Sequence, residues 1–185
     1  LFSFPVTGGL LSELTLFIFK YFFRQTVSNV EYFFLSIHSN QISSIESGDF
    51  VGLDNLHTLS LAQNQLTTMM TMPLTINNLN RLDLSENLLT SIESDDFDSL
   101  SNLQYLGLYD NQITSIDSDD FDSLVNLNQI DLGGNLITSI ENTDFDSLSN
   151  LQYLYLGNNQ ITSIDSDDFD SLSNLQYLGL YNNNI

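Results

Sequence analysis

Residues 100–123 read LSNLQYLGLYDNQITSIDSDDFDS, and residues 148–171 read LSNLQYLYLGNNQITSIDSDDFDS. Both stretches are 24 residues long, and they differ at three positions only: Gly107/Tyr155, Tyr109/Gly157 and Asp110/Asn158. A unit copied this closely is typical of repeat architectures, in which each unit covers the apolar faces of its neighbours. The repeat therefore decides the fold, and the three differing positions raise the question of which surface they occupy.

Asparagines recur through most of the chain at nearly constant spacing. They stand 24, 23, 24, 24, 24 and 24 residues apart in the frame L/I-x-L/I-x-x-N-x-L/I, and they are Asn40, Asn64, Asn87, Asn111, Asn135, Asn159 and Asn183. A second apolar set follows each one, for example Ile116, Phe121 and Leu124. Alternation with period two predicts a short strand whose leucines point inward and whose intervening residues point outward. Stacked units then pair these strands into a parallel sheet along one face of a solenoid.

This pattern resembles the leucine-rich-repeat family in its 24-residue class, LxxLxxLxLxxNxLxxLxxxxFxxL, over residues 30–185 in about seven repeats. The resemblance implies an α/β-type repeat solenoid, shaped as a horseshoe, with a parallel β-sheet on the concave face. It also implies turns or short 3₁₀ segments on the convex face, little α-helix, and a ladder of asparagines bonded to the backbone of adjacent turns. The junction F-D-x-L at residues 97–100 is similar to that of variable lymphocyte receptors.

The two ends depart from the repeat pattern. Residues 1–29 are predicted to form a degenerate first repeat or an N-terminal cap, because Phe22 stands where an asparagine is expected. At the other end Ile185 matches Ile113 and Ile161, so the last repeat is truncated. Since the chain opens on Leu1 rather than Met, we expect a mature product or a fragment. An uncapped apolar end is also predicted to favour end-to-end self-association.

Charge restricts the classes of partner. The 185 residues include 24 Asp and Glu against three Lys and Arg, for a formal net charge of -21. This balance argues against nucleic acid and anionic membrane surfaces, which attract lysine and arginine, and it favours a basic partner. The most apolar run, residues 10–23, is interrupted by Glu13 and Lys20 and is too short for a membrane span. With no cysteine, the chain has neither disulfides nor thiolate metal sites.

Catalytic and metal-binding motifs are weak. No nucleophile or paired buried carboxylate accompanies His38 and His57, so we predict that the protein is not an enzyme and needs no cofactor. The motif SDDFDS at residues 94–99, 118–123 and 166–171, with NTDFDS at 142–147, is expected to stack into two files: Asp95, Asp119, Thr143 and Asp167, then Asp96, Asp120, Asp144 and Asp168. Weak Ca²⁺ binding at these acidic turns is one interpretation, and a solvated acidic flank without metal is the other.

Counting back from each asparagine places four files of side chains on the expected concave face. They are Arg81, Tyr105, Gln129, Tyr153 and Tyr177; Asp83, Gly107, Asp131, Tyr155 and Gly179; Ser85, Tyr109, Gly133, Gly157 and Tyr181; and Glu86, Asp110, Gly134, Asn158 and Asn182. Six of the eight tyrosines lie here, and an exposed aromatic patch usually signals interaction. The candidate ligand-binding residues are Arg81, Asp83, Glu86, Tyr105, Tyr109, Asp110, Asp131, Tyr153, Tyr155, Asn158, Tyr177 and Tyr181. The alternative is a solvated sheet whose tyrosines only support cross-strand packing.

The predicted function is a non-catalytic recognition module. The resemblance implies a concave face that binds a protein or glycan ligand, and the acidic groups favour a basic or hydroxyl-bearing one. The 24-residue class is typical of extracellular or cell-surface proteins. The alternative is a structural, self-assembling surface or filament protein. In both cases the three positions that differ between the copied stretches fall on the outward files or at their exit, while the apolar scaffold is unchanged.

Overall fold

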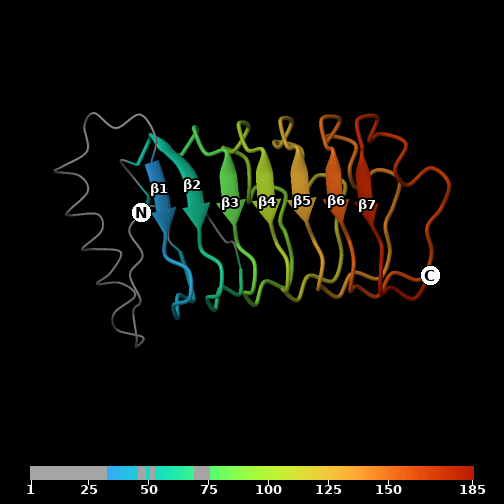
Figure 1. Cartoon of the computed structure of the whole chain (residues 1–185), viewed down its shortest axis with the longest axis horizontal. Coiled ribbons are helices and arrows are strands. Elements are labelled where there is room, and N and C mark those ends of the chain that lie inside the picture. Colours follow the sequence, from blue (N-terminus) through green and yellow to red (C-terminus); the bar gives the residue numbers. More distant parts are fainter. Residues whose placement is uncertain (1–32, 46–48, 51–52, 69–75) are drawn as a thin grey trace.

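The computed structural model shows one row of stacked turns and describes residues 33–45, 49–50, 53–68 and 76–185 (Figure 1). Each turn contributes one short strand to a single seven-stranded sheet, ordered as in the sequence. The strands are β1 (Phe33–Ser36), β2 (Leu56–Ser60), β3 (Arg81–Asp83), β4 (Tyr105–Gly107), β5 (Gln129–Asp131), β6 (Tyr153–Tyr155) and β7 (Tyr177–Gly179). Every neighbouring pair is parallel, which confirms the predicted solenoid. The predicted first repeat or cap at residues 1–29 lies outside the described residues.

The period-two alternation produces the inner wall of the core. In β3 to β6 the central residue of each strand is fully buried, and the register pairs Leu82 with Leu106, Leu106 with Ile130, and Ile130 with Leu154. The flanking residues of each strand point out of the sheet. Each buried leucine or isoleucine side chain contributes roughly 1.5–3 kcal/mol relative to its exposed state, so the core grows with every turn added.

A ladder of inward asparagines ties each turn to the one before it. The Oδ1 atom of Asn111 accepts a hydrogen bond from the Leu89 N–H at 3.0 Å, and its Nδ2 donates to the carbonyls of Leu84 and Leu108, both at 3.1 Å. The same kind of bridge to the preceding turn is made by Asn64, Asn87, Asn135, Asn159 and Asn183. These bonds satisfy backbone groups where the strand ends, so the predicted asparagine ladder is confirmed.

The residue before each ladder asparagine has a left-handed backbone. Its φ lies between 54° and 67° at Ser39, Gln63, Glu86, Asp110, Gly134, Asn158 and Asn182. This conformation turns the chain after the strand and directly precedes the inward-pointing asparagine. Gly, Asn and Asp tolerate it best, because a Cβ there meets the following carbonyl oxygen. Asp110 and Asn158, which differ between the two copied stretches, are therefore both residue types that suit this backbone conformation.

Turns and stacked phenylalanines form the convex side. The rings of Phe97 and Phe121 are 6.4 Å apart between centroids, and those of Phe121 and Phe145 are 6.2 Å apart and nearly parallel, at 5°. Parallel strands are about 4.8 Å apart, so each turn is wider at the phenylalanines than at the sheet. That difference bends the row and places the sheet on the concave side.

The connections consist of turns with bonds between residues three apart, such as Asp96 N–H to the Glu93 carbonyl at 3.0 Å. The expected turns are confirmed, and the structure assigns neither α-helix nor 3₁₀ helix to the residues it describes. Within those same ranges, no helix has the length and apolar character needed to cross a membrane.

Replacing Asn111 by alanine should lower the free energy of unfolding by roughly 1–3 kcal/mol, because the buried Leu89 N–H loses its partner and the carbonyls of Leu84 and Leu108 each lose one of two donors. The neighbouring Gln112→Ala, at an exposed position, is the matched control and should change it by less than about 0.5 kcal/mol. Urea unfolding followed by circular dichroism measures both variants. Equal stability of the two would contradict the structural role of the ladder.

Candidate functional site

The predicted outward files come together on one surface, which we call the sheet face. The strand register aligns Arg81, Tyr105, Gln129, Tyr153 and Tyr177 in one file and Asp83, Gly107, Asp131, Tyr155 and Gly179 in the next. Backbone hydrogen bonds continue the alignment beyond the strands, from Glu86 N–H to the Tyr109 carbonyl and from Asp110 N–H to the Gly133 carbonyl. The files that carry the twelve candidate ligand-binding residues are therefore placed as predicted.

Glycines support the tyrosine rings of the sheet face. A Cβ at Gly157 would meet the ring of Tyr181 at 2.5 Å, and one at Gly133 would meet the ring of Tyr109 at 3.4 Å. A Cβ at Gly179 would lie 3.1 Å from the ring of Tyr177. Each of these rings thus lies against backbone that has no side chain. The space left by glycine fixes where the rings lie.

This packing explains two of the three differences between the copied stretches. One copy has Gly107 and Tyr109, and the other has Tyr155 and Gly157, so tyrosine and glycine exchange places. A second tyrosine at position 157 would overlap the ring of Tyr181. In each copy one of the two positions carries a tyrosine and the other carries glycine, so the ring shifts by two residues along the chain. The sheet face therefore changes shape from turn to turn without overcrowding.

Aromatic and charged contacts divide the sheet face into two regions. Near β3 and β4, the Arg81 guanidinium carbon lies 3.4 Å from the centroid of the Tyr105 ring, a cation–π contact worth about 0.5–1 kcal/mol at an exposed site. Near β6 and β7, the rings of Tyr155 and Tyr177 are 5.0 Å apart at an angle of 39°. Tyr177 and Tyr181 of this second region are exposed, and so is Tyr109 just after β4. The second region therefore carries exposed aromatic rings.

Burial and neighbouring groups raise the pKa of two tyrosines and one aspartate on the sheet face. Burial raises the pKa of the Tyr105 phenol. The nearby Arg81 lowers this pKa, and Asp83 and Asp131 raise it further. Burial also raises the pKa of Tyr155, and the neighbouring Tyr177 adds to the effect. The pKa of the Asp131 carboxyl is raised mainly by burial, although its Oδ1 accepts the Gly133 N–H at 3.0 Å. Neutral phenols can both donate and accept hydrogen bonds.

The prediction of a wholly solvated acidic flank is wrong for the second aspartate of each SDDFDS motif. Asp96, Asp120, Asp144 and Asp168 are buried. In each of them Oδ2 accepts the N–H of the residue three positions earlier, at 2.7–2.8 Å. The carboxylate accepts a hydrogen bond from the backbone of its own turn and is buried there, even though the motif is rich in charge. The sequence alone does not show which of two adjacent aspartates turns inward.

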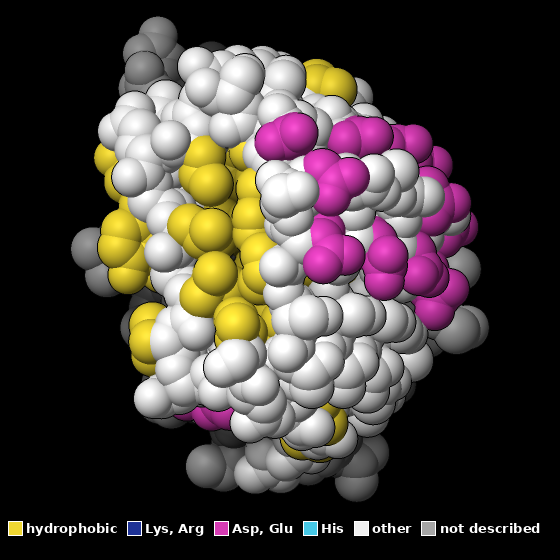
Figure 2. Space-filling view, turned by 90° about the vertical axis from the view of Figure 1, so that its right-hand side faces the viewer, with side chains coloured by type: hydrophobic (Ala, Val, Ile, Leu, Met, Phe, Trp, Pro, Cys, Tyr) yellow, Lys and Arg dark blue, Asp and Glu magenta, His cyan; other side chains and the backbone are white. Residues whose placement is uncertain are grey.

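The remaining acidic residues of the motif do lie outside. Asp95, Asp119 and Asp167 are exposed, and acidic side chains gather along one flank of the molecule (Figure 2). The third aspartate of the motif accepts a hydrogen bond from the next turn: Ser123 Oγ donates to Asp98 Oδ1 at 3.0 Å, and Ser147 Oγ donates to Asp122 Oδ1. Ca²⁺ binding at the acidic turns stays a prediction. No group of three or more His, Cys, Asp or Glu suited to a metal ion occurs among the described residues.

Sequence reasoning missed a second ladder of carboxamides at the start of the strands. Its members donate through Nδ2 to a carbonyl of the preceding turn at 2.7–2.9 Å, and they are Asn78, Asn102, Asn126, Asn150 and Asn174. The signal that could have shown it is the repeated tripeptide N-L-Q or N-L-N, as at residues 102–104 and 126–128. Unlike the first ladder, this one is exposed.

The fold and the sheet face together define a parallel repeat solenoid with one open, aromatic sheet surface. The profile of the family described as leucine rich repeat matches residues 77–137 and 126–185, which together are more than half of the chain. The chain belongs to the leucine-rich-repeat family.

Solved structures agree with that assignment. An internalin (inlF) from Listeria monocytogenes aligns with a TM-score of 0.61 and 25% identity over 77% of this chain and 39% of the internalin. TLR13, in a complex with ssRNA13, aligns with a TM-score of 0.62 and 28% identity over 83% of this chain and 25% of TLR13. The chain thus spans well under half the length of either protein. A search of curated proteins found no match.

The solenoid should become more stable as the pH falls from neutral to mildly acidic. Burial raises the pKa of Asp96, Asp120 and Asp144 from the ordinary 3.8 to about 6, so the folded chain binds protons that the unfolded chain does not. Stability is then greatest below the unfolded pKa and is lost as the pH rises through the folded pKa. Thermal unfolding should give a higher midpoint at about pH 5 than at about pH 7.5.

A triple variant isolates the source of this pH dependence. Asp96→Asn, Asp120→Asn and Asp144→Asn together keep an acceptor oxygen in each turn and remove the titration, so the difference between the two midpoints should shrink. The matched control replaces the exposed Asp167 and Asp170, which do not contribute to these pKa shifts, by asparagine and should retain the difference. A triple variant with unchanged pH dependence would overturn this assignment.

Proposed function

We propose that the protein is a non-catalytic recognition module that binds a protein or glycan ligand through its sheet face. The observation that carries the proposal is the aromatic surface of Tyr109, Tyr155, Tyr177 and Tyr181 on the sheet, in which the rings of Tyr109, Tyr177 and Tyr181 are exposed. Tyrosine provides a large contact area at low entropic cost, and the phenol adds a hydrogen bond. An extracellular or cell-surface location agrees with this role.

Charge favours a ligand with basic or hydroxyl groups. Lys20 and Arg24 lie outside the described residues, so Arg81 is the one Lys or Arg in the part that the structure describes, and its guanidinium faces Tyr105. Asp83 and Asp131 border the tyrosines with negative charge. TLR13 is in a complex with single-stranded RNA, but a chain with a net charge of -21 would repel phosphates, so we propose no nucleic-acid ligand here.

A structural, self-assembling role is the second candidate. The end view in Figure 2 shows apolar side chains exposed in the middle of the last turn. Ile185 is 64% exposed, and Ile164, Phe169, Leu178 and Leu180 are only partly buried there. In the inner turns the equivalent positions are covered by a neighbour. Either a following repeat or a second copy stacked end to end would cover the same apolar groups.

Removing aromatic rings from the sheet face should weaken ligand binding while leaving stability almost unchanged. We expect Tyr153→Ala, Tyr155→Ala and Tyr177→Ala together to reduce the affinity for a ligand selected from a glycan array or a peptide display library by at least about tenfold. The matched control, Val125→Ala with Leu136→Ala, removes exposed apolar side chains elsewhere and should bind normally. A tyrosine variant that unfolds early but binds normally would contradict the proposal.

Light scattering after size-exclusion chromatography separates the two candidate functions. A recognition module should elute as a particle of constant mass over a wide range of protein concentrations. Open-ended stacking should give a mass that grows with concentration. In that case Ile185→Asp, which places a charge on the exposed end, should reduce the growth, whereas Val125→Asp on the side of the solenoid should leave it unchanged.

A further inference from the structure

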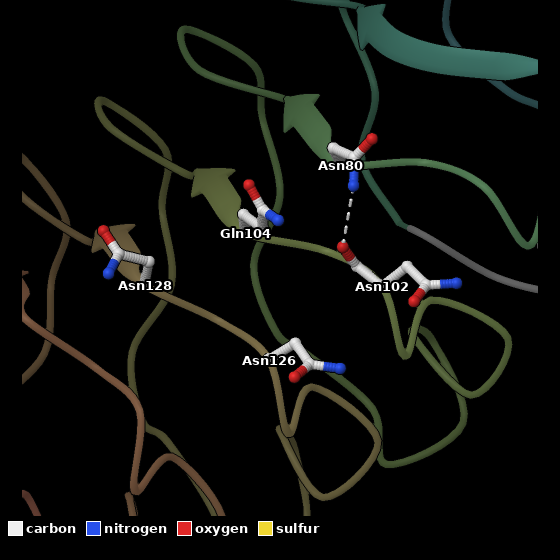
Figure 3. Close-up of a pocket in the computed structure, with 5 residues that line it drawn as sticks. All are labelled: Asn80, Asn102, Gln104, Asn126 and Asn128. Carbon is white, nitrogen blue, oxygen red and sulfur yellow. Dashed lines mark hydrogen bonds between the residues drawn. The ribbon is translucent and has the colours of Figure 1, made fainter.

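A polar groove runs beside the sheet where the strands begin. Five side chains line a hollow of about 490 Å³ there, and all of them are carboxamides: Asn80, Asn102, Gln104, Asn126 and Asn128 (Figure 3). Asn80, Gln104 and Asn128 directly precede β3, β4 and β5, and Asn102 and Asn126 belong to the turns just before β4 and β5. Three successive turns thus build the hollow. Its volume is within the range of about 300–1,000 Å³ that is typical of ligand sites.

Three of the five carboxamides hold the backbone in place. Asn102 Nδ2 donates to the Asn77 carbonyl at 2.7 Å, and Asn126 Nδ2 donates to the Ser101 carbonyl at 2.9 Å. Asn80 Nδ2 donates to the Asn102 carbonyl at 3.2 Å, the bond drawn in Figure 3. These bonds fix the orientation of the amides and therefore of their Oδ1 acceptors. This wall of the groove is therefore preorganised for binding.

The side chains of the other two carboxamides keep unused hydrogen-bond donors and acceptors. The side chains of Gln104 and Asn128 make no hydrogen bond to any other residue that the structure describes, although their backbone groups are bonded between turns. Each offers two donor hydrogens and an acceptor oxygen. Neither is needed for the cross-turn bonds that hold the neighbouring asparagines. The groove therefore has fixed acceptors on one side and adaptable donors and acceptors on the other.

The composition of the lining selects the chemistry of a ligand. It contains no charged group, in a chain whose net charge is -21. An anion would find no cation to pair with, and a metal ion would find no carboxylate. An apolar ligand would leave the amides buried without partners, at a cost of roughly 1–3 kcal/mol each. A neutral ligand with many hydroxyl groups satisfies them, because a hydroxyl also donates and accepts.

The groove repeats with the solenoid. The residue before each strand is Asn80, Gln104, Asn128, Gln152 or Gln176 in β3 to β7, and Gln176 Nε2 reaches Gln152 Oε1 at 3.2 Å. Turns paired by parallel strands are about 4.8 Å apart, which is comparable with the length of one sugar ring in an extended chain. A linear oligosaccharide would meet the same pair of side chains at each turn. The lining offers no apolar pockets for the side chains of a peptide.

We propose that this carboxamide groove binds a neutral oligosaccharide. The proposal is independent of the ligand of the sheet face, because neither Gln104 nor Asn128 belongs to the aromatic surface. Binding to the groove would let the protein attach along a polysaccharide while the tyrosines remain available to a different partner.

Isothermal titration calorimetry with cellohexaose, laminarihexaose and maltohexaose tests the proposal on the intact chain. At least one of these neutral probes should bind, and its affinity should change little with sodium chloride, since no charge takes part. The double variant Gln104→Ala with Asn128→Ala should bind about tenfold more weakly or worse. The matched control is Gln112→Ala with Gln160→Ala, which removes two exposed carboxamides on another surface.

The control variant should bind as the unchanged chain does, and thermal melting should show that both double variants are folded. The Tyr153→Ala, Tyr155→Ala, Tyr177→Ala variant should also retain the oligosaccharide, which separates this site from the sheet face. The proposal is overturned if none of the three probes binds, or if the double variant binds as well as the control. Stronger binding of oligogalacturonate or of a neutral Gly-Ser peptide than of every probe would overturn it as well.

Discussion

The hydrogen bonds between each inward asparagine and the backbone of the preceding turn are the interaction on which the rest of the structure depends. The residue before each asparagine has a left-handed backbone, so the chain turns there after the strand. The amide of Asn111 then accepts one bond and donates two to the backbone of two different turns. A buried N–H or carbonyl without a partner costs roughly 1–3 kcal/mol, so the ladder largely decides whether short three-residue strands can stack.

Curvature and surface shape follow from that stacking. The asparagines hold the turns together at the strand spacing on one side, while the phenylalanine rings keep them 6.2–6.4 Å apart on the other. The wider side is convex, and the sheet becomes the inside of the bend. Side chains on the sheet are therefore crowded, and glycines under the rings of Tyr109 and Tyr181 relieve the crowding. The exchange of tyrosine and glycine between the copied stretches changes the surface within the limits that this packing allows.

The acidic motif illustrates how one short sequence serves several physical purposes. Its second aspartate leaves water to close a turn, its phenylalanine extends the convex stack, and its third aspartate accepts a bond from the next turn. Its first aspartate is exposed to solvent, and its third is exposed as well while it accepts that bond. Most of the motif is thus explained by the architecture. Burying carboxyl groups at this position makes the stability of the solenoid sensitive to pH, since each of them is easier to protonate in the folded chain than in the unfolded one.

The sequence by itself determined the solenoid, the parallel order of the strands, the inward asparagines and the outward files, because all of them follow from one local pattern repeated at a fixed period. Residues such as Leu106 and Tyr105 alternate across a strand whatever lies beyond it. Only the tertiary structure decided which of Asp119 and Asp120 is buried, where glycines lie under tyrosine rings, and that amides from three turns meet in one groove. These features depend on contacts between residues of different turns, and their distances are set by how the turns stack rather than by the pattern within any one of them.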